Sequence, residues 1–368
     1  MKILFLSAAN SNHTVKWVNT FSKRGHQVYL VCNKGHEPSE NHINPEVKLH
    51  ILKYGGVLGY YLNAFELAQY VKKIVPDVIN VHYASGYGTL ARISRISPYI
   101  LSVWGSDVYE FPLQSRMKRY ILEKNVNYAT TLASTSNCMA DQLKKVLDNQ
   151  DLKIAITPFG VDLDRFSPAL YADKNNHKKK KIVIGTVKAL KPVYGIKELL
   201  LAFSDLKEKM VGSADVRLMV YGDGEQRTEL ERLIKELKLE NSVQMPGKIP
   251  NVMVPEALSE FDIFCALSHR ESFGVAAVEA MAMKKPVVVS KADGLQEVVE
   301  DGVTGYVVDV HDREGTVDRL QHLAMNPELR LQMGEAGRKR TELLYDWNKN
   351  VNQMLKLYES VRYRDGAK

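Results

Sequence analysis

Cysteines are scarce in this chain of 368 residues, which has only three of them, Cys32, Cys138 and Cys265. They are odd in number, widely spaced and placed in apolar or helical contexts. This arrangement excludes a disulfide framework and argues against cysteine metal ligands. We therefore expect reduced thiols in a cytoplasmic protein.

Long hydrophobic runs are also missing. No apolar stretch approaches the roughly 18–20 residues that cross a bilayer, and residues 1–7 predict a strand rather than a signal peptide. The chain is 45% hydrophobic and 25% charged, which is typical of a soluble globular protein. Its length suffices for two domains, each with its own core.

Acidic residues are outnumbered, with 43 Asp and Glu against 50 Lys and Arg and a net charge of +7. A positive balance favours phosphates, nucleic acid or an anionic membrane surface as partners. The sequence contains no recognised nucleic-acid-binding module, so we expect no nucleic-acid partner.

Strand and helix patterns alternate through the first half of the chain. This alternation predicts a parallel sheet with helices on both faces. The expected strands are 2–6, 27–32, 47–52, 78–82, 99–103, 130–134 and 153–157, and the expected helices include 14–23, 62–74, 113–125 and 136–147.

A polar, basic segment at residues 173–181 has no hydrophobic period and predicts an exposed linker. A strand pattern restarts at 182–187, and the alternation continues from there. We therefore expect an N-terminal domain over 1–170, a C-terminal domain over 171–346, and a last helix at about 347–368.

Residues 261–290 predict a strand, a polar loop, a helix and a second strand. In an open parallel sheet, ligands bind where strands end and helices begin, and a helix N-terminus attracts anions. Ser272 is a candidate N-cap, and Gly274 lets a ligand approach the backbone. Glu271 lies in the loop and Glu279 on the helix. Their spacing alone is equally compatible with an ordinary surface loop and a solvated glutamate.

The wider sequence decides between these interpretations. The blocks Glu-Ser-Phe-Gly at 271–274, Glu-Ala-Met-Ala at 279–282, Pro-Val-Val-Val-Ser at 286–290 and the segments 294–299 and 301–308 follow in a characteristic order. They resemble the C-terminal half of family 4 retaining glycosyltransferases, of the bacterial surface-polysaccharide type. The resemblance implies the GT-B fold: two Rossmann-like α/β domains that face each other across a cleft, with the C-terminal helix crossing back to the N-terminal domain.

The resemblance also implies a donor site in the C-terminal domain. Glu271 would contact the transferred sugar and Glu279 the ribose hydroxyls. Relatives hold the diphosphate with an Arg and a Lys, whereas this sequence offers Lys188 and Lys191, and which of the two replaces the Arg stays open. A leaving diphosphate needs such cations because it gains negative charge. The other donor-binding residues implied are Ser272, Phe273, Gly274, Val275, Gly247, Lys248 and Ile249.

The N-terminal half departs from the family pattern. The Gly-Gly pair that follows the first strand in many relatives is absent, so Ser11 and Asn12 become the donor-contacting candidates. Trp104 replaces a histidine, and Asp107 is the residue that we retain there as catalytic, although a turn aspartate is the alternative. His82, at a strand end, and His13 are the acceptor-side candidates, and a structural histidine is the alternative for His82.

By resemblance, the chain transfers a sugar from a nucleotide-sugar, with UDP favoured over GDP, to a glycan or lipid-linked acceptor with retention of configuration. We expect a hexosyltransferase-type enzyme with no cofactor and no metal, because the Asp-x-Asp at 162–164 falls in the interdomain segment. A basic, aromatic stretch at 114–124 suggests peripheral binding to an anionic membrane surface. A nucleotide-sugar epimerase and a non-catalytic nucleotide-sugar-binding subunit are the alternatives.

Overall fold

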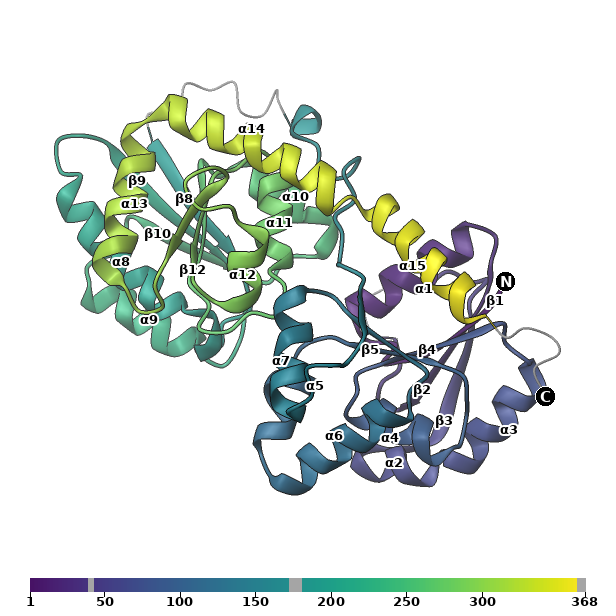
Figure 1. Ribbon diagram of the computed structural model, residues 1–368. Coiled ribbons are helices and arrows are strands. Elements are labelled where there is room, and N and C mark those ends of the chain that lie inside the picture. The colour runs from purple at the N-terminus through teal and green to yellow at the C-terminus, as the bar shows by residue number, and fades with distance from the viewer. Residues whose placement is uncertain (39–42, 172–180, 363–368) are drawn as a thin grey trace. The chain divides into compact units, whose positions relative to one another are not determined.

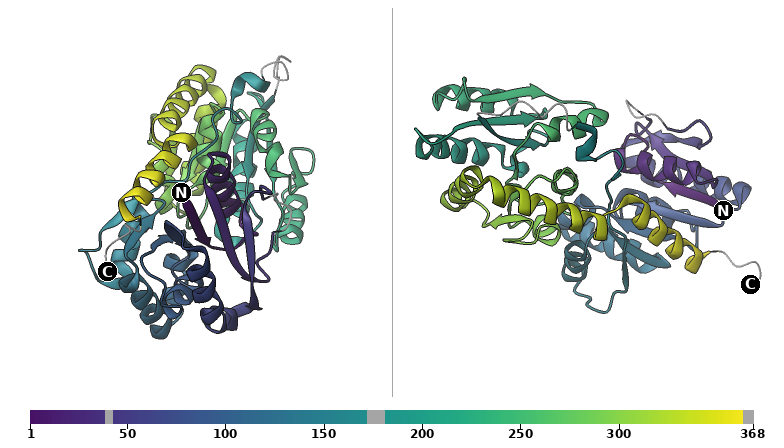
Figure 2. Two further views of the ribbon diagram at one scale, coloured as in Figure 1. Left: turned by 90° about the vertical axis from the view of Figure 1, so that its right-hand side faces the viewer. Right: turned by 90° about the horizontal axis from the view of Figure 1, so that it is seen from above.

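The computed structural model describes residues 1–38, 43–171 and 181–362. The chain divides into two compact units: unit 1 comprises Met1–Thr157 and Asn352–Lys368, and unit 2 comprises Pro158–Val351. Each unit is a parallel sheet with helices on both faces (Figures 1 and 2). The predicted α/β fold class is confirmed. Of the predicted linker, only Lys181 belongs to the described residues.

The sheet of unit 1 has seven parallel strands in the order β3-β2-β1-β4-β5-β6-β7. Its strands are β1 (Lys2–Leu6), β2 (Gln27–Lys34), β3 (Lys48–Gly55), β4 (Val78–His82), β5 (Ile100–Val103), β6 (Thr131–Ser134) and β7 (Ile154–Ile156). The strands β2 and β3 are added on one side of β1, and β4 to β7 are added on its other side. The direction in which the sheet grows therefore reverses between β1 and β4. Such a reversal leaves a crevice at the carboxyl ends of the two strands, where open α/β sheets bind ligands.

The helices of unit 1 connect these strands. They are α1 (Asn12–Lys23), α2 (Gly56–Leu62), α3 (Ala64–Ile74), α4 (Gly86–Ile93), α5 (Ser106–Tyr109), α6 (Arg116–Tyr128) and α7 (Asn137–Leu147), with a 3₁₀ turn η1 (Phe111–Leu113). The sequence predicted helices close to α1, α3, α6 and α7. It did not predict α2 or α4.

Unit 2 repeats the same topology with six parallel strands in the order β10-β9-β8-β11-β12-β13. Its strands are β8 (Lys181–Val187), β9 (Asp215–Tyr221), β10 (Val243–Gly247), β11 (Ile263–Ala266), β12 (Val287–Ser290) and β13 (Gly305–Val308). The reversal falls here between β8 and β11.

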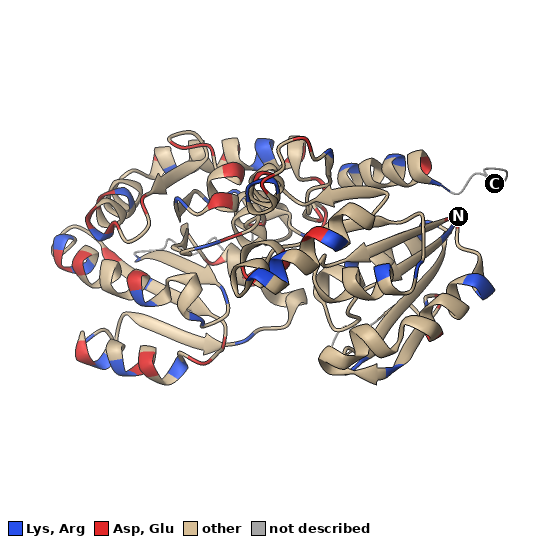
Figure 3. Cartoon of the chain, turned by 60° about the horizontal axis from the view of Figure 1, so that its bottom comes forward, with Lys and Arg blue, Asp and Glu red and all other residues tan. Residues whose placement is uncertain are grey.

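The helices of unit 2 are α8 (Ile196–Lys209), α9 (Arg227–Glu236), α10 (Val254–Ser259), α11 (Val275–Ala282), α12 (Asp293–Val298), α13 (Arg313–Met325) and α14 (Pro327–Leu344). The short 3₁₀ turns are η2 (Pro168–Tyr171), η4 (Pro192–Tyr194) and η5 (Asn251–Met253). Lys, Arg, Asp and Glu are interspersed along the helices (Figure 3). The net positive charge is therefore spread over many elements.

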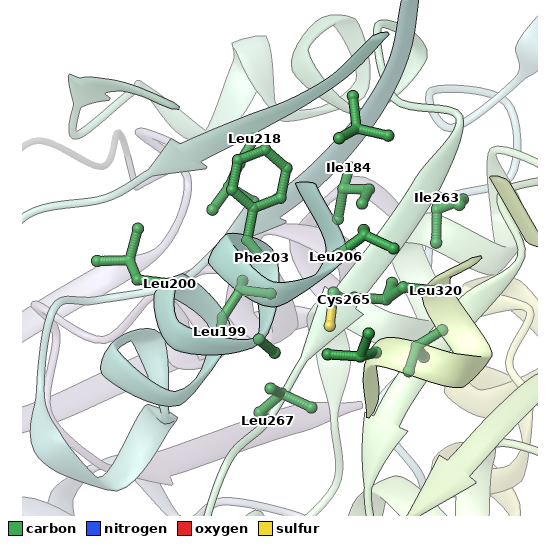
Figure 4. Packing of buried hydrophobic residues seen from close by; sticks show 14 of the residues in the cluster. Ile184, Leu199, Leu200, Phe203, Leu206, Leu218, Ile263, Cys265, Leu267 and Leu320 are labelled. Carbon is green, nitrogen blue, oxygen red and sulfur yellow. The ribbon is translucent and has the colours of Figure 1, made fainter. Parts of the chain in front are cut away.

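The core of unit 2 forms because α8 carries apolar residues at helical spacing on one face. Leu199, Phe203 and Leu206 are buried and belong to one cluster with Ile184 on β8 and Leu218 on β9. Figure 4 shows these side chains pointing toward one another between the helix and the sheet. Burial on both faces explains why the strands β11 and β12 are nearly continuous apolar runs.

The segment that follows β7 belongs to unit 2. The Val161 amide donates to the Tyr345 carbonyl at 2.8 Å, and the Trp347 amide donates to the Val161 carbonyl at 3.0 Å. Gly160 lies so close to the Trp347 backbone that a Cβ would clash with it. These contacts explain why unit 2 begins at Pro158, although the sequence placed a boundary after residue 170.

The last helix, α15 (Trp347–Val361), begins in unit 2 and continues into unit 1. Its Tyr358 is fully buried in unit 1, where the hydroxyl accepts a hydrogen bond from Asn80 Nδ2 at 2.7 Å. The Tyr358 ring lies 5.4 Å from that of Phe21 on α1, and Figure 1 shows the two helices side by side.

None of the described helices is long and apolar enough to span a membrane. All three cysteines are free thiols, and Cys32 and Cys265 are buried. Burial raises the pKa of the Cys32 thiol to about 11, so this thiol is un-ionised near neutral pH.

Candidate functional site

The central pair of the candidate site lies at the point where the chain reverses across the sheet of unit 2. Lys188 directly follows β8, and Glu271 lies in the loop after β11, the neighbouring strand. Because both strands are parallel, their carboxyl ends meet at one edge of the sheet. This edge is the one at which open α/β sheets bind ligands.

Lys188 and Glu271 form an ion pair through Lys188 Nζ and Glu271 Oε2. Their side chains are only 12% and 14% exposed. The same carboxylate oxygen lies 3.5 Å from Ser268 Oγ, and Lys188 Nζ lies 4.7 Å from the centre of the Tyr194 ring. A partly buried cation in such a setting interacts with a bound anion more strongly than it would in bulk water.

Two glycines let the loops of this edge pack closely. A Cβ on Gly195, the residue before α8, would clash with the carbonyl of Leu267. A Cβ on Gly222, which has φ of +150°, would clash with the carbonyl of Lys188. The Lys188 amide in turn donates to the Tyr221 carbonyl at 2.9 Å. The backbone around Lys188 is therefore fixed by direct backbone contacts.

The helix after the loop begins later than the sequence predicted. Gly274, with φ of +97°, is the N-cap of α11, and Ser272 lies two residues before it. The predicted capping role of Ser272 is wrong, because the chain needs a left-handed residue to turn into α11 and glycine adopts that conformation without strain. The first amides of α11, from Val275 onward, lie at the positive end of the helix dipole.

Gly294 fixes the loop that carries Glu271. The Gly294 amide donates to the Glu271 carbonyl at 2.7 Å, and a Cβ on Gly294 would clash with the backbone of Phe273. The Phe273 side chain is buried, with its ring 5.8 Å from that of Phe159 and 5.6 Å from that of Tyr345. Phe273 therefore contributes its backbone, and not its ring, to the edge of the sheet.

Glu279 is a half-buried residue of α11. It lies four residues beyond Val275, about 6 Å along the helix axis at 1.5 Å per residue. The turn after β10 reaches the same edge, since the Gly222 amide donates to the Gly247 carbonyl at 2.9 Å. Gly247 has φ of +97° and is followed by the exposed Lys248 and the half-buried Ile249.

The structure separates the two candidate lysines. Lys188 is paired with Glu271, whereas the Lys191 side chain is exposed. Leu190, between them, is fully buried, and its amide donates to the Asp223 carbonyl at 3.0 Å. The buried leucine places Lys188 and Lys191 in different environments, and only Lys188 belongs to the cluster around Glu271.

Unit 1 brings its candidate residues together at its own reversal point, between β1 and β4. His82 Nδ1 lies 3.0 Å from Ser7 Oγ, and the His82 ring lies 4.0 Å from that of Trp104. The Trp104 ring contacts His13 edge-on at 5.9 Å. Burial, helped by nearby positive charge, lowers the pKa of His13 to about 4 and that of His82 to about 3. Both imidazoles are therefore neutral near pH 7.

Asp107 is 1% exposed and accepts hydrogen bonds from three backbone amides. The donors are Ala84 at 2.8 Å, Gly105 at 2.8 Å and Trp104 at 3.1 Å. Burial outweighs these bonds and raises its pKa. Each carboxylate oxygen accepts at least one of these hydrogen bonds, so Asp107 links the segment at Ala84 to the turn at Trp104 and Gly105.

Ser11 and Asn12 lie at the start of α1, just after β1. Ser11 is the N-cap and Asn12 the first helical residue. In place of a glycine pair, this turn is fixed by the amides of Ala9 and Asn10, which donate to the carbonyl of His36 at 2.9 and 3.2 Å.

Two residues that the sequence analysis missed belong to the cluster of unit 2. Tyr194 lies under Lys188, and Ser268 lies beside Glu271. Tyr194 lies three residues after the candidate Lys191, so an aromatic residue near a candidate lysine was a usable signal. Ser268 had no such signal, because a single serine after a strand is common.

Two family models match the chain, one on each half. The model described as Glycosyl transferase 4-like matches residues 2–136, and the model described as Glycosyl transferases group 1 matches residues 169–340. Among curated relatives, N-acetyl-alpha-D-glucosaminyl L-malate synthase of Bacillus anthracis is 23% identical over 93% of this chain and 90% of its own.

Solved structures show the same fold. Sucrose-phosphate synthase from Thermosynechococcus elongatus superposes with a TM-score of 0.84 at 19% identity, covering 97% of this chain and 98% of the other. Anabaena HepE, solved in complex with UDP, superposes with a TM-score of 0.79 at 18% identity, covering 98% and 100%. The fold is thus that of the GT-B glycosyltransferases. The chain itself belongs to the glycosyltransferases of the family 4 type.

Proposed function

We propose that this glycosyltransferase moves a sugar from a nucleotide-sugar, a UDP-sugar before a GDP-sugar, to a hydroxyl of a glycan or lipid-linked oligosaccharide in cell-surface polysaccharide synthesis. The anomeric configuration is retained. The Lys188–Glu271 pair, beside the N-terminus of α11 at the ligand-binding edge of unit 2, is the observation that carries the proposal. The complex of Anabaena HepE with UDP supports the choice of nucleotide.

In this proposal the diphosphate replaces the carboxylate as the partner of Lys188. Lys188 Nζ and the first amides of α11 stabilise the negative charge that develops on the leaving group. Glu271, released from Lys188, accepts hydrogen bonds from the transferred sugar. Glu279, further along the helix, accepts hydrogen bonds from the ribose, and the turn at Gly247 contacts the base.

The transfer step balances without a protein nucleophile. The bond between the anomeric carbon and the phosphate oxygen breaks, and its electron pair stays on the diphosphate. The acceptor oxygen bonds to the anomeric carbon on the same face, and its proton passes to the leaving phosphate oxygen. We propose that this step needs no metal, because Lys188 and the helix N-terminus supply the positive charge at the diphosphate.

The acceptor binds to unit 1 in this proposal. His13 is half-buried and contacts Trp104, so it is the acceptor-side group that a substrate can reach. His82 is 1% exposed and acts through the Trp104 ring as a positioning residue. Ser11 and Asn12 are proposed to contact the donor phosphates from the N-terminus of α1.

A surface of unit 1 supports peripheral binding to an anionic membrane. Helix α4 packs against both α2 and α6, and Figure 1 shows these helices along one side of the sheet. We call the exposed apolar residues of this side the apolar layer: Val57, Leu58, Tyr61, Leu62, Phe65, Leu113, Met117 and Tyr120. Lys53, Arg116 and Lys124 are exposed within or beside it. Apolar side chains with basic neighbours suit an interfacial position on an anionic bilayer.

Nucleotide binding and product analysis test the proposal together. A thermal-shift panel of UDP, GDP, ADP and CMP should show one nucleotide that raises the melting temperature, because ligands that bind only the folded state stabilise it. Proton NMR of the product formed from the matching nucleotide-sugar should show the donor's anomeric configuration. An altered free donor with no acceptor present would indicate an epimerase. Donor binding with no turnover on any acceptor would favour a binding subunit, and no shift with any nucleotide would contradict the donor site.

A further inference from the structure

A second cluster of unit 2 brings together three potential metal ligands, Glu198, His269 and His311. One ligand atom from each residue lies within 4.8 Å of the other two, and this is the one such group that the described residues contain. His269 Nε2 lies 2.9 Å from Glu198 Oε1, and His311 Nδ1 lies 3.8 Å from the same oxygen. The two imidazole rings are 4.5 Å apart.

Three separate elements build this cluster. Glu198 lies in the first turn of α8, His269 follows β11, and His311 lies between β13 and α13. The close contact between Gly195 and Leu267 brings the start of α8 to the end of β11. The His269 amide donates to the Val193 carbonyl at 2.8 Å, which fixes the loop that carries it. His311 has φ of +69°, a backbone conformation that non-glycine residues adopt uncommonly.

The distances fit a transition metal. Tetrahedral zinc with ligands at about 2.0–2.1 Å places neighbouring donor atoms about 3.3 Å apart. The two separations from Glu198 Oε1, 2.9 and 3.8 Å, lie on either side of this value. His311 is 63% exposed, so its ring has room to move the short distance that closes the set. Two imidazoles and one carboxylate leave at least one coordination position for water.

We propose that Glu198, His269 and His311 form a binding site for a divalent transition metal of the zinc type. The metal joins α8, the loop after β11 and the loop before α13. Because His269 lies two residues before Glu271, the bound ion also holds the segment that carries the donor-site carboxylate. Its two nitrogen ligands select against Mg²⁺, which prefers oxygen ligands.

The test is metal binding by the full chain without any affinity tag and without nucleotide. A chromophoric chelator competing for Zn²⁺ should report one site per chain in the wild type. His311→Ala removes an exposed ligand, so the fold should survive. The affinity for Zn²⁺ should fall by at least about 10-fold, because even the mutation of a residue that hydrogen-bonds a ligand commonly causes a loss of that size. Glu198→Gln should weaken binding in the same way, and Mg²⁺ should not compete.

His50 and Glu66 provide a matched control in unit 1. His50 Nε2 and Glu66 Oε1 are also 2.9 Å apart, with side chains 30% and 36% exposed, but they belong to no group of three ligands among the described residues. His50→Ala should therefore bind Zn²⁺ as the wild type does. Equal affinities of wild type and His311→Ala would overturn the proposal, as would a wild type that binds no Zn²⁺. Neither outcome depends on nucleotide binding, so the metal-site proposal can fail without affecting the proposed transfer reaction.

Discussion

Lys188 and Glu271 form an ion pair across 83 residues of sequence, and each side chain is almost shielded from water. The pair exists because β8 and β11 are neighbours in the sheet. A buried charge that loses its partner is costly, so each of the two side chains holds the other in place.

Replacing the lysine by an uncharged residue of similar length tests this relationship. Lys188→Met should lower kcat/KM by about 10²–10³-fold, the usual effect of removing one group that stabilises a developing oxyanion. Release of nucleoside diphosphate from the donor measures it. Lys291→Met is the control, because Lys291 forms an exposed ion pair with Asp309 in the same unit. A Lys188→Met enzyme with wild-type kcat/KM would remove Lys188 from the donor site.

The ribose assignment predicts a loss of binding. Glu279→Ala should weaken the affinity for the preferred nucleotide by about 10-fold or more, because hydrogen bonds to a charged group contribute about 1.5–3 kcal/mol. Isothermal titration calorimetry with the free nucleotide measures the change. Glu236→Ala alters an exposed glutamate at the end of α9 and should bind normally. Unchanged affinity of Glu279→Ala would refute the ribose contact.

Two histidines of unit 1 with lowered pKa values, His13 and His82, predict a loss of stability in acid. The folded protein keeps His13 and His82 neutral down to about pH 4 and 3, whereas the unfolded chain protonates them near pH 6.5. The unfolded state therefore binds more protons below pH 6.5, and the free energy of unfolding falls as the pH falls. At pH 5 the loss is about 2 kcal/mol per imidazole.

Chemical denaturation at pH 7 and pH 5 measures this effect. His13→Gln should lose part of the pH dependence, since it lacks one of the histidines whose pKa is lowered in the folded protein. If His13→Gln and the wild type lost the same free energy of unfolding between pH 7 and pH 5, the lowered pKa of His13 would be contradicted.

The apolar layer predicts vesicle binding by unit 1. Val57 and Phe65 are 75% and 74% exposed, so Val57→Glu with Phe65→Glu should not disturb the core but should reduce binding to vesicles that contain an anionic phospholipid. Flotation at physiological salt measures the bound fraction. Leu331→Glu is the matched control, because Leu331 is 65% exposed on α14 of unit 2. Equal flotation of the double variant and the wild type would exclude this surface.

The sequence predicted most strands and the long helices, because both sheets consist of short apolar runs separated by amphipathic segments. It missed α2 and α4, whose glycines lower helix propensity. A Cβ on Gly59 in α2 would clash with the carbonyl of Tyr54, and one on Gly86 in α4 would clash with the Tyr60 ring. Close packing, which a local pattern does not reveal, holds these two helices.

The candidate site also contains residues that the sequence predicted and residues that it did not. The family resemblance directed attention to Lys188 and Glu271, and the structure pairs them. The sequence could not predict that Gly274 caps α11, because the cap depends on the left-handed turn before the helix. Nor could the sequence predict the cluster of Glu198, His269 and His311, whose members come from the first turn of α8 and from two loops. Only the order of the strands in the sheet brings these elements together.

The passage of α15 from unit 2 into unit 1 has a consequence for biosynthesis. Unit 2 is one uninterrupted stretch of chain inserted between the two parts of unit 1. The ribosome therefore makes all of unit 2 before it adds Tyr358, whose side chain fills the core beside Phe21 and Asn80. Unit 1, whose synthesis begins first, is therefore completed last. Until Tyr358 is added, the core of unit 1 lacks one of its buried aromatic rings.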